Sequence, residues 1–348
     1  MRSHLRAIVA VALVAALLAL FFHDVDLWRV VADVAHARPE WLALSLGTTV
    51  VNLAIRAWRW KVLLEPLGSA TFGNAFRATA VGFAATSVLP ARAGEVIRPY
   101  FLARTERHLE RMSATGAFAT IVLERLLDTV TVLVLLAAFV FVFGREGGAA
   151  SPAAFAAVKW AGALAGLAAV VALAVLFVLA GDSGRIARAL ARLEQVGRSA
   201  LAGMLARIAE KFIRGLGAIR RPGRLLVALL WSFPLWLSIC LGIWAVTRAF
   251  DLDVPFTGSF LLDAVLVLGV AVPTPGAIGG FHEAFRVAAT VFFAVPDDAA
   301  VAAAIVLHAF SIGPSLVLGL LFAAQAGLSV GGMRHLADHA PVRSGPAA

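Results

Sequence analysis

The most constraining feature of this 348-residue sequence is a series of long apolar segments separated by short charged stretches. A transmembrane helix needs about 20 mostly apolar residues, because the bilayer core is about 30 Å thick and a helix rises about 1.5 Å per residue. Hydrophobic residues make up 61% of the chain and charged residues only 15%. This composition excludes an ordinary water-soluble domain, a disordered chain and a disulfide scaffold. The sequence predicts an all-α polytopic integral membrane protein with six full spans: 5–22, 41–64, 113–143, 156–180, 225–250 and 301–328.

The charges between these segments set the expected orientation. Residues 24–40 carry four carboxylates against two arginines, whereas 181–224 carry nine arginines and one lysine against three carboxylates, a net charge of +7. Positively charged loops stay on the cytoplasmic side of a membrane. We therefore expect a multi-pass protein of the cell (inner) membrane with both termini in the cytoplasm. The net charge of +9 for the chain then needs no nucleic-acid partner.

Two further apolar segments are broken by proline and glycine. Residues 72–90 form a short segment followed by arginines, and 259–293 form a long one interrupted in its middle. From the charges, each segment begins and ends on the same side of the membrane. We expect two opposed re-entrant hairpins, the first entering from the cytoplasm; the alternative is that both cross fully, which gives eight spans. The expected helix breaks are Pro90, Gly94, Pro273, Pro275, Gly276 and Gly279.

Ionisable residues stand beside both breaks. Arg92, Glu95 and Arg98 accompany the first, and Glu283 and Arg286 follow the second. The Glu-x-x-Arg spacing is the same in both, and residues three apart share a helix face. A similar break and charge pair in two oppositely entering segments suggests an inverted repeat. In many transporters the broken helices of such repeats meet at the substrate site.

A third charged group lies inside the segment 113–143. Glu124 and Asp128 are four residues apart and share a helix face, with Arg125 beside them. Each such residue costs at least about 2.5–3.5 kcal/mol inside a membrane unless it is paired or hydrated. The group either lines a polar path or forms a structural ion-pair network between helices. A weaker set is Asn52 with Arg56, since Arg56 and its neighbour Arg59 could instead reach the interface.

Several catalytic sites are excluded by the sequence. His282-Glu283 begins like a zinc-protease helix, but residue 286 is Arg rather than the second His. The glycines at 276–280 lack the Lys-Ser/Thr of a nucleotide phosphate loop. The one cysteine, Cys240, permits neither an internal disulfide nor a cysteine metal cluster. We expect no metal and no cofactor, and a transporter rather than an enzyme.

The polar segment 181–222 has its own pattern. Apolar residues recur there at helical spacing, with the arginines on the opposite face. This pattern is typical of a basic amphipathic helix on the inner leaflet, which either recognises anionic headgroups or anchors the topology. We expect residues 1–328 to form one transmembrane domain that includes this segment, and 329–348 to be a disordered cytoplasmic tail.

Four motifs in order resemble the lysylphosphatidylglycerol synthase transmembrane region, also called the flippase-like domain family. They are Arg56-Ala57-Trp58-Arg59-Trp60, Leu89-Pro90-Ala91-Arg92-Ala93-Gly94-Glu95-Val96-Ile97-Arg98, Leu123-Glu124-Arg125-Leu126-Leu127-Asp128 and Pro273-Thr274-Pro275-Gly276-Ala277-Ile278-Gly279. In such synthases this region translocates an aminoacylated lipid that a separate soluble domain makes. Because about 20 residues follow Leu328, the resemblance implies a stand-alone member with the translocation half alone.

Three functions are compatible with these features. The favoured one is a lipid flippase or transporter for an anionic, aminoacylated or polyprenyl-linked lipid. In it, Arg92, Arg98 and Arg286 neutralise the phosphate, and the carboxylates pair these arginines or carry protons. The alternatives are a membrane-embedded lipid aminoacyl- or glycosyltransferase and a non-catalytic partner of a separate synthase or glycosyltransferase. The cavity residues expected from the sequence are Arg92, Glu95, Arg98, Glu124, Arg125, Asp128, Glu283, Arg286, Asn52 and Arg56.

Overall fold

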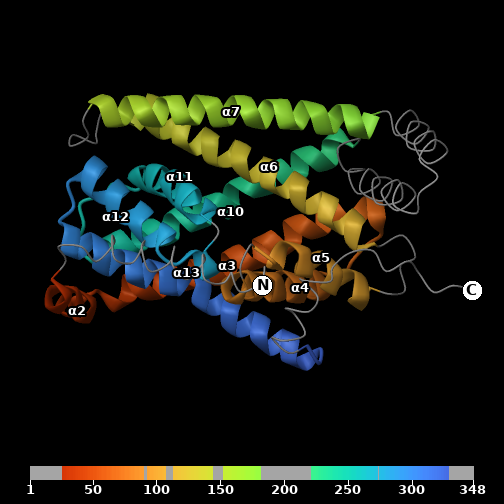
Figure 1. The fold of residues 1–348 in the computed structure, drawn as a ribbon, viewed down its shortest axis with the longest axis horizontal. Helices are drawn as coiled ribbons and strands as arrows, with labels where there is room; N and C mark the ends of the chain where they lie inside the picture. The colour runs from red at the N-terminus through yellow and green to blue at the C-terminus, as the bar shows by residue number, and fades with distance from the viewer. Residues whose placement is uncertain are drawn as a thin grey trace, which may run out of the picture.

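The computed structural model describes residues 26–89, 92–106, 113–143, 152–181, 221–272 and 274–328. The predicted span 5–22, most of the basic segment 181–222 and the tail 329–348 lie outside these residues, as do Pro90 and Pro273. Within the described ranges every regular element is a helix (Figure 1). The elements are α2 (Leu27–His36), α3 (Pro39–Leu64), η1 (Glu65–Leu67), α4 (Phe72–Val88), α5 (Gly94–Thr105), α6 (Ala114–Ala138), η2 (Phe139–Phe143), α7 (Pro152–Gly181), α10 (Pro222–Ala249), α11 (Gly258–Ala271), η4 (Pro275–Ala277), α12 (Gly280–Phe293) and α13 (Asp297–Gln325).

The long apolar segments predicted from the sequence coincide with long helices. Segment 41–64 is α3, 113–143 is α6 with η2, 156–180 lies in α7, 225–250 in α10 and 301–328 in α13. Among the described residues, α7, α10 and α13 are long and apolar enough to cross a membrane. Helices α3 and α6, with 26 and 25 residues, are similar in length but carry the charged residues described below.

Helices α3 and α10 pack antiparallel and define two ends of the molecule. At one end Arg38 N donates to the carbonyl of Ala249 (2.9 Å) and the Trp41 and Trp244 rings pack edge to face. At the other end Arg224 pairs with Glu65 (2.8 Å). We call these the Trp41 end and the Glu65 end.

The first hairpin, α4 with α5, begins and ends at the Glu65 end. The carboxylate of Glu106, just after α5, accepts from the backbone N–H of Thr71 and the side chain of Asn74 at the start of α4 (3.0 Å each). The helices touch closely where Gly82 faces Gly94, because a Cβ on Gly94 would overlap the Gly82 carbonyl oxygen.

The second hairpin, α11 with α12, begins and ends at the Trp41 end. Phe256, just before α11, packs edge to face on Trp244, and Gly258 lies against the Phe293 ring at the end of α12. Between the helices the chain turns through Gly276 and Gly279, whose φ values of 61° and 85° suit glycine. This confirms that the segment 259–293 is broken in its middle.

The tips of the two hairpins meet inside the molecule. Arg92, at the tip of the first hairpin, donates a hydrogen bond to the carbonyl of Val270 near the end of α11 (2.8 Å). Gly276 lies against the carbonyl oxygen of Ser87 at the end of α4. In Figure 1, α11 and α12 lie in one half of the molecule and α4 and α5 in the other. The two predicted breaks are therefore neighbours in space.

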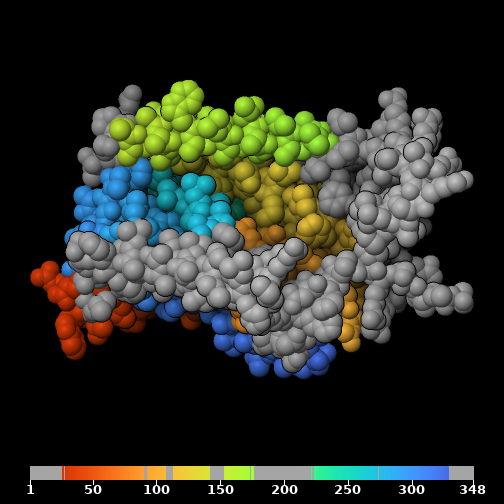
Figure 2. Space-filling view, viewed as in Figure 1, coloured from red at the N-terminus to blue at the C-terminus, as the bar shows by residue number. Residues whose placement is uncertain are grey.

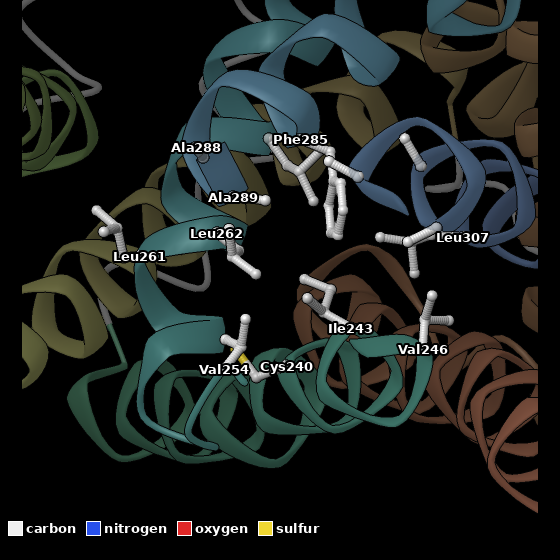
Figure 3. Close-up of a cluster of buried hydrophobic side chains, with 14 of the residues drawn as sticks. Cys240, Ile243, Val246, Val254, Leu261, Leu262, Phe285, Ala288, Ala289 and Leu307 are labelled. Carbon is white, nitrogen blue, oxygen red and sulfur yellow. The ribbon is translucent and has the colours of Figure 1, made fainter. Parts of the chain in front are cut away.

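The apolar side chains divide into packed core and exposed surface. In Figure 3, Ile243 and Val246 of α10, Phe285 of α12 and Leu307 of α13 point toward one another in a buried cluster. Helix α7 lies along α6 at one edge of the molecule and exposes most of its apolar side chains (Figure 2). Such a long, exposed apolar surface suits contact with lipid rather than water.

Candidate functional site

The centre of the site is Arg59, whose side chain is 0% exposed. Its Nη1 donates to Asp128 Oδ1 (2.6 Å) and its Nη2 to Glu124 Oε1 (2.9 Å). The two carboxylates are four residues apart and face the same side of α6, so one planar guanidinium can bridge them. Nη1 also donates to the Ser232 hydroxyl on α10 (2.7 Å). Arg59 thereby joins α3, α6 and α10.

Arg98 brings the first hairpin into the same group. Its Nη1 donates to Glu124 Oε2 (2.9 Å), so that Glu124 binds Arg59 and Arg98 through different oxygens. The Arg98 guanidinium carbon lies 3.9 Å from the centroid of the Trp60 indole, a cation–π contact. The Trp60 N–H is fixed in turn by the Thr120 hydroxyl (2.9 Å).

Two further arginines lie near Asp128 at longer distances. Arg56 and Arg125 approach Asp128 Oδ2 to 3.5 and 3.6 Å, and the Trp236 indole N–H donates to Oδ1 (2.9 Å). The Arg56 guanidinium also lies 5.2 Å from the Phe83 ring centroid. We call Arg56, Arg59, Arg98, Glu124 and Asp128, all buried, the central arginine cluster.

The central arginine cluster has more positive than negative charge, and several of its guanidinium nitrogens form no hydrogen bond. It contains three guanidiniums and two carboxylates. Nitrogen atoms Nε and Nη1 of Arg56, and Nε and Nη2 of Arg98, are buried with no hydrogen-bond partner, although Arg56 Nη1 lies 3.5 Å from Asp128 Oδ2, which itself accepts no hydrogen bond. A buried charge or donor without a partner is costly, so the arrangement favours an additional anion.

Asp263 of α11 is a buried carboxylate that the sequence patterns did not single out. It is 3% exposed and interacts electrostatically with Arg56 and Asp128. Among the described residues it has no ion pair within 4 Å and no side-chain hydrogen bond partner, unlike Glu124 and Asp128. Its signal in the sequence is a single carboxylate in a 14-residue helix that is otherwise apolar or small. An ionisable residue in that setting is a functional candidate by itself.

The ionisable residues beside the first break have different partners. Arg98 turns toward Glu124, while Glu95 faces Arg92 at 3.9 Å with both side chains about one-third exposed. Glu95 and Arg98 are three residues apart in α5 but do not pair with each other, because Glu124 and the Trp60 ring hold Arg98 inside the bundle.

The residues beside the second break form a separate ionic group. Arg286 binds Glu283 with two hydrogen bonds (3.0 and 2.9 Å) and Asp297, at the start of α13, with a third (3.0 Å). Within the described residues no ion pair links this group to the central arginine cluster. Of the predicted cavity residues, the structure brings together Arg56, Arg98, Glu124, Arg125 and Asp128 and leaves Glu283 and Arg286 in a second group.

Asn52 joins neither set of ion pairs: its amide donates to the Leu235 carbonyl (3.0 Å) and the Ser238 hydroxyl (3.3 Å) of α10.

The close glycine contacts align the two hairpins with each other differently from the alignment that the Glu-x-x-Arg motifs suggest. A Cβ on Gly82 would collide with Arg98 Cβ, and one on Gly269 would collide with Ala284 Cβ. Gly94 in turn contacts Gly82, and Gly280 contacts Gly269. In this register Ala284, not Arg286, corresponds to Arg98. The two Glu-x-x-Arg motifs therefore do not stand at equivalent positions when the hairpins are aligned by their glycine pairs.

The described helix breaks lie where the hairpin tips meet. Gly94 begins α5, and Pro275, Gly276 and Gly279 form the turn between α11 and α12. His308 of α13 holds this turn through a 2.8 Å hydrogen bond from Nε2 to the Gly276 carbonyl.

Comparison with known proteins agrees with this architecture. The model of the lysylphosphatidylglycerol synthase TM region matches residues 7–319. The UPF0104 membrane protein MJ1595 of Methanocaldococcus jannaschii is 31% identical over 108 residues, which cover 30% of this chain and 31% of that relative. The chain is an integral membrane protein, and it belongs to the family of lysylphosphatidylglycerol synthase transmembrane regions.

Proposed function

We propose that this protein moves a lipid with an anionic headgroup between the leaflets of the membrane. The observation that carries the proposal is the set of buried guanidinium N–H groups of Arg56 and Arg98 that form no hydrogen bond. Arginine binds phosphate oxygens through its planar fork of donors, and such charge-assisted hydrogen bonds are strong. A phosphodiester headgroup would supply both the missing charge and the missing acceptors.

We propose that both hairpins are re-entrant and that the chain has six full spans. Each hairpin begins and ends at one end of the bundle. The α4 helix, with 17 residues, is about 26 Å long and α11, with 14 residues, about 21 Å, both shorter than the about 30 Å core of a bilayer. The Trp41 end carries carboxylates, among them Asp251, Asp297 and Asp298. This supports a cell-membrane protein with the Glu65 end, and with it both termini, in the cytoplasm.

The contact between the hairpin tips would act as the barrier to the headgroup. Separation of the tips would break the Arg92 hydrogen bond to Val270 and part Gly276 from Ser87. The phosphate would then take up the free donors of Arg98 and Arg56, while Glu124 keeps Arg59 in place. Arg98 is the mobile member in this scheme, because its guanidinium donates one hydrogen bond, whereas that of Arg59 donates three, to Asp128, Glu124 and Ser232.

The test is lipid movement in vesicles that contain the purified protein. We expect the wild type to accelerate the transfer of labelled phosphatidylglycerol between leaflets, and Arg98→Gln to lower the rate at least about tenfold, the effect of losing one charged hydrogen bond. Arg104→Gln is the matched control, since Arg104 is an exposed residue of the same helix. Size-exclusion profiles identify variants that fail to fold.

Two results would contradict the proposal. One is a wild type that accelerates no anionic phospholipid or polyprenyl lipid. The other is an equal loss of rate in Arg98→Gln and Arg104→Gln. We further propose that a separately encoded synthase or glycosyltransferase supplies the lipid, and co-purification from membranes tests this association.

A further inference from the structure

Asp263 lies beside the proposed headgroup site but is not used by it. The carboxylates that the sequence suggested for proton transfer are engaged: Glu124 and Asp128 in the central arginine cluster, Glu95 near Arg92 and Glu283 with Arg286. Asp263 is more than nine-tenths buried and forms no ion pair within 4 Å among the described residues. An ionised carboxylate in that setting is costly, and uptake of a proton removes the charge.

The groups that face Asp263 come from several helices. Arg56 of α3 and Asp128 of α6 interact with it electrostatically, as does the Cys240 thiol of α10. On α12, which packs along α11, Glu283 and Arg286 bind each other, and the His282 ring packs at a tilt against the ring of His308 (centroids 4.4 Å apart). The charge that Asp263 adjoins is therefore that of the central arginine cluster.

The charge of this site depends on the protonation of Asp263. With Asp263 ionised, the three buried guanidiniums are balanced by three buried carboxylates, so that their summed charge is zero. With Asp263 protonated, the site carries one excess positive charge, equal and opposite to that of one phosphodiester. Arg125 is set aside in this count because its side chain is 38% exposed to solvent.

We propose that Asp263 is a proton-binding site whose protonation is coupled to the binding of the phosphodiester headgroup. The proton adds to a carboxylate oxygen of Asp263, and the anion then meets an unopposed guanidinium charge. Coupling between two sites is reciprocal, so that headgroup binding also promotes proton uptake. The inference rests on the proposed function, and it supplies the energy source: one proton accompanies each phosphodiester toward the side of higher pH.

The test compares anion binding across pH in three variants of the purified full chain. The probe is phosphatidylglycerol in mixed micelles, with inorganic phosphate and a zwitterionic phospholipid as parallel probes. For the wild type we expect the affinity for phosphatidylglycerol to fall as pH rises, by up to about tenfold per unit for one linked proton. In Asp263→Asn, which resembles the protonated state, the affinity should stay at its low-pH value throughout.

Control variants separate this role from a structural one. Asp253→Asn, at an exposed position in the loop before α11, should keep the wild-type pH dependence. Asp263→Glu should restore that dependence at a shifted midpoint. An infrared carbonyl band of a protonated carboxyl should appear when the lipid binds to the wild type and be absent in Asp263→Asn. Binding of inorganic phosphate with the same pH dependence would identify the phosphate group alone as the coupled ligand.

The outcomes distinguish this inference from the proposed function. If the wild type binds phosphatidylglycerol and Asp263→Asn keeps the wild-type pH dependence, the inference is wrong and the proposed function stands. If the wild type binds with no pH dependence, the inference is likewise wrong. If the wild type binds the anionic lipid no better than the zwitterionic one, both are overturned.

Discussion

The two hairpins share a backbone design and differ in the charges they carry. Each turns at a proline- and glycine-containing tip, and each holds its helices together at one pair of glycines, Gly82 with Gly94 and Gly269 with Gly280. The first places Arg98 in the central arginine cluster, where the second has Ala284. The second instead carries Asp263 on its other helix. In the proposed function the repeated backbone would form the gate, and the unequal charges would favour binding of an anion.

The largest expected effect is the difference in stability lost when Arg59 and Arg286, one from each ionic group, are replaced. Arg59→Leu removes the residue that bridges Glu124 and Asp128 and should cost about 3–5 kcal/mol, because it leaves buried carboxylates under-paired. Arg286→Leu removes an ion pair nearer the surface and should cost no more than about 1 kcal/mol. Unfolding by denaturing detergent in mixed micelles measures both. Equal losses of stability would contradict the distinction between a central and a peripheral ionic group.

The glycine pairs provide the next largest effect. A Cβ at Gly94 or at Gly280 would overlap a backbone carbonyl of the facing helix, so Gly94→Val and Gly280→Val should each cost about 3 kcal/mol. Gly73→Ala is the control on α4, since nothing lies within 4 Å of its added Cβ. A thermal scan of the three purified variants tests whether the two hairpins are built alike. If either valine variant were as stable as the wild type, the two hairpins would not be equivalent in structure.

The smallest effect is expected at the hairpin tips. Arg92→Ala removes the hydrogen bond to the Val270 carbonyl, worth about 1 kcal/mol. Stability should hardly change, while amide hydrogen exchange at 274–279 should rise severalfold because the second tip loses its partner. Arg77→Ala, at an exposed position of α4, should leave that exchange as in the wild type. Unchanged exchange in Arg92→Ala would show that this bond does not hold the tips together.

Much of the architecture follows from the sequence because hydrophobicity and helix breaking are local properties. Runs of apolar residues set the long helices, and Gly276 and Gly279 mark the second break through the backbone angles that they adopt. The carboxylates of the Trp41 end, among them Asp251, Asp297 and Asp298, can likewise be counted from the sequence. These features need no knowledge of which helices touch.

The site depends on how helices rotate and pair, which local patterns do not determine. The spacing of Glu95 and Arg98 indicates a shared face, yet Arg98 binds Glu124 because α5 packs on α6. The likeness to Glu283 and Arg286 is misleading for the same reason, since the close glycine contacts set a different register. Asp263 belongs to no motif, and only the fold shows that it interacts electrostatically with Arg56 and Asp128.

The most direct test of the central claim is photo-crosslinking of phosphatidylglycerol that carries a photoreactive headgroup to the protein in vesicles, followed by peptide mapping. The account predicts labelling around the central arginine cluster, in peptides that include Phe83, Arg98 and Glu124, and loss of that labelling in Arg98→Gln but not in Arg104→Gln. Labelling confined to the exposed apolar face of α7, and equal in all three proteins, would show that the headgroup never enters the site and would contradict the account.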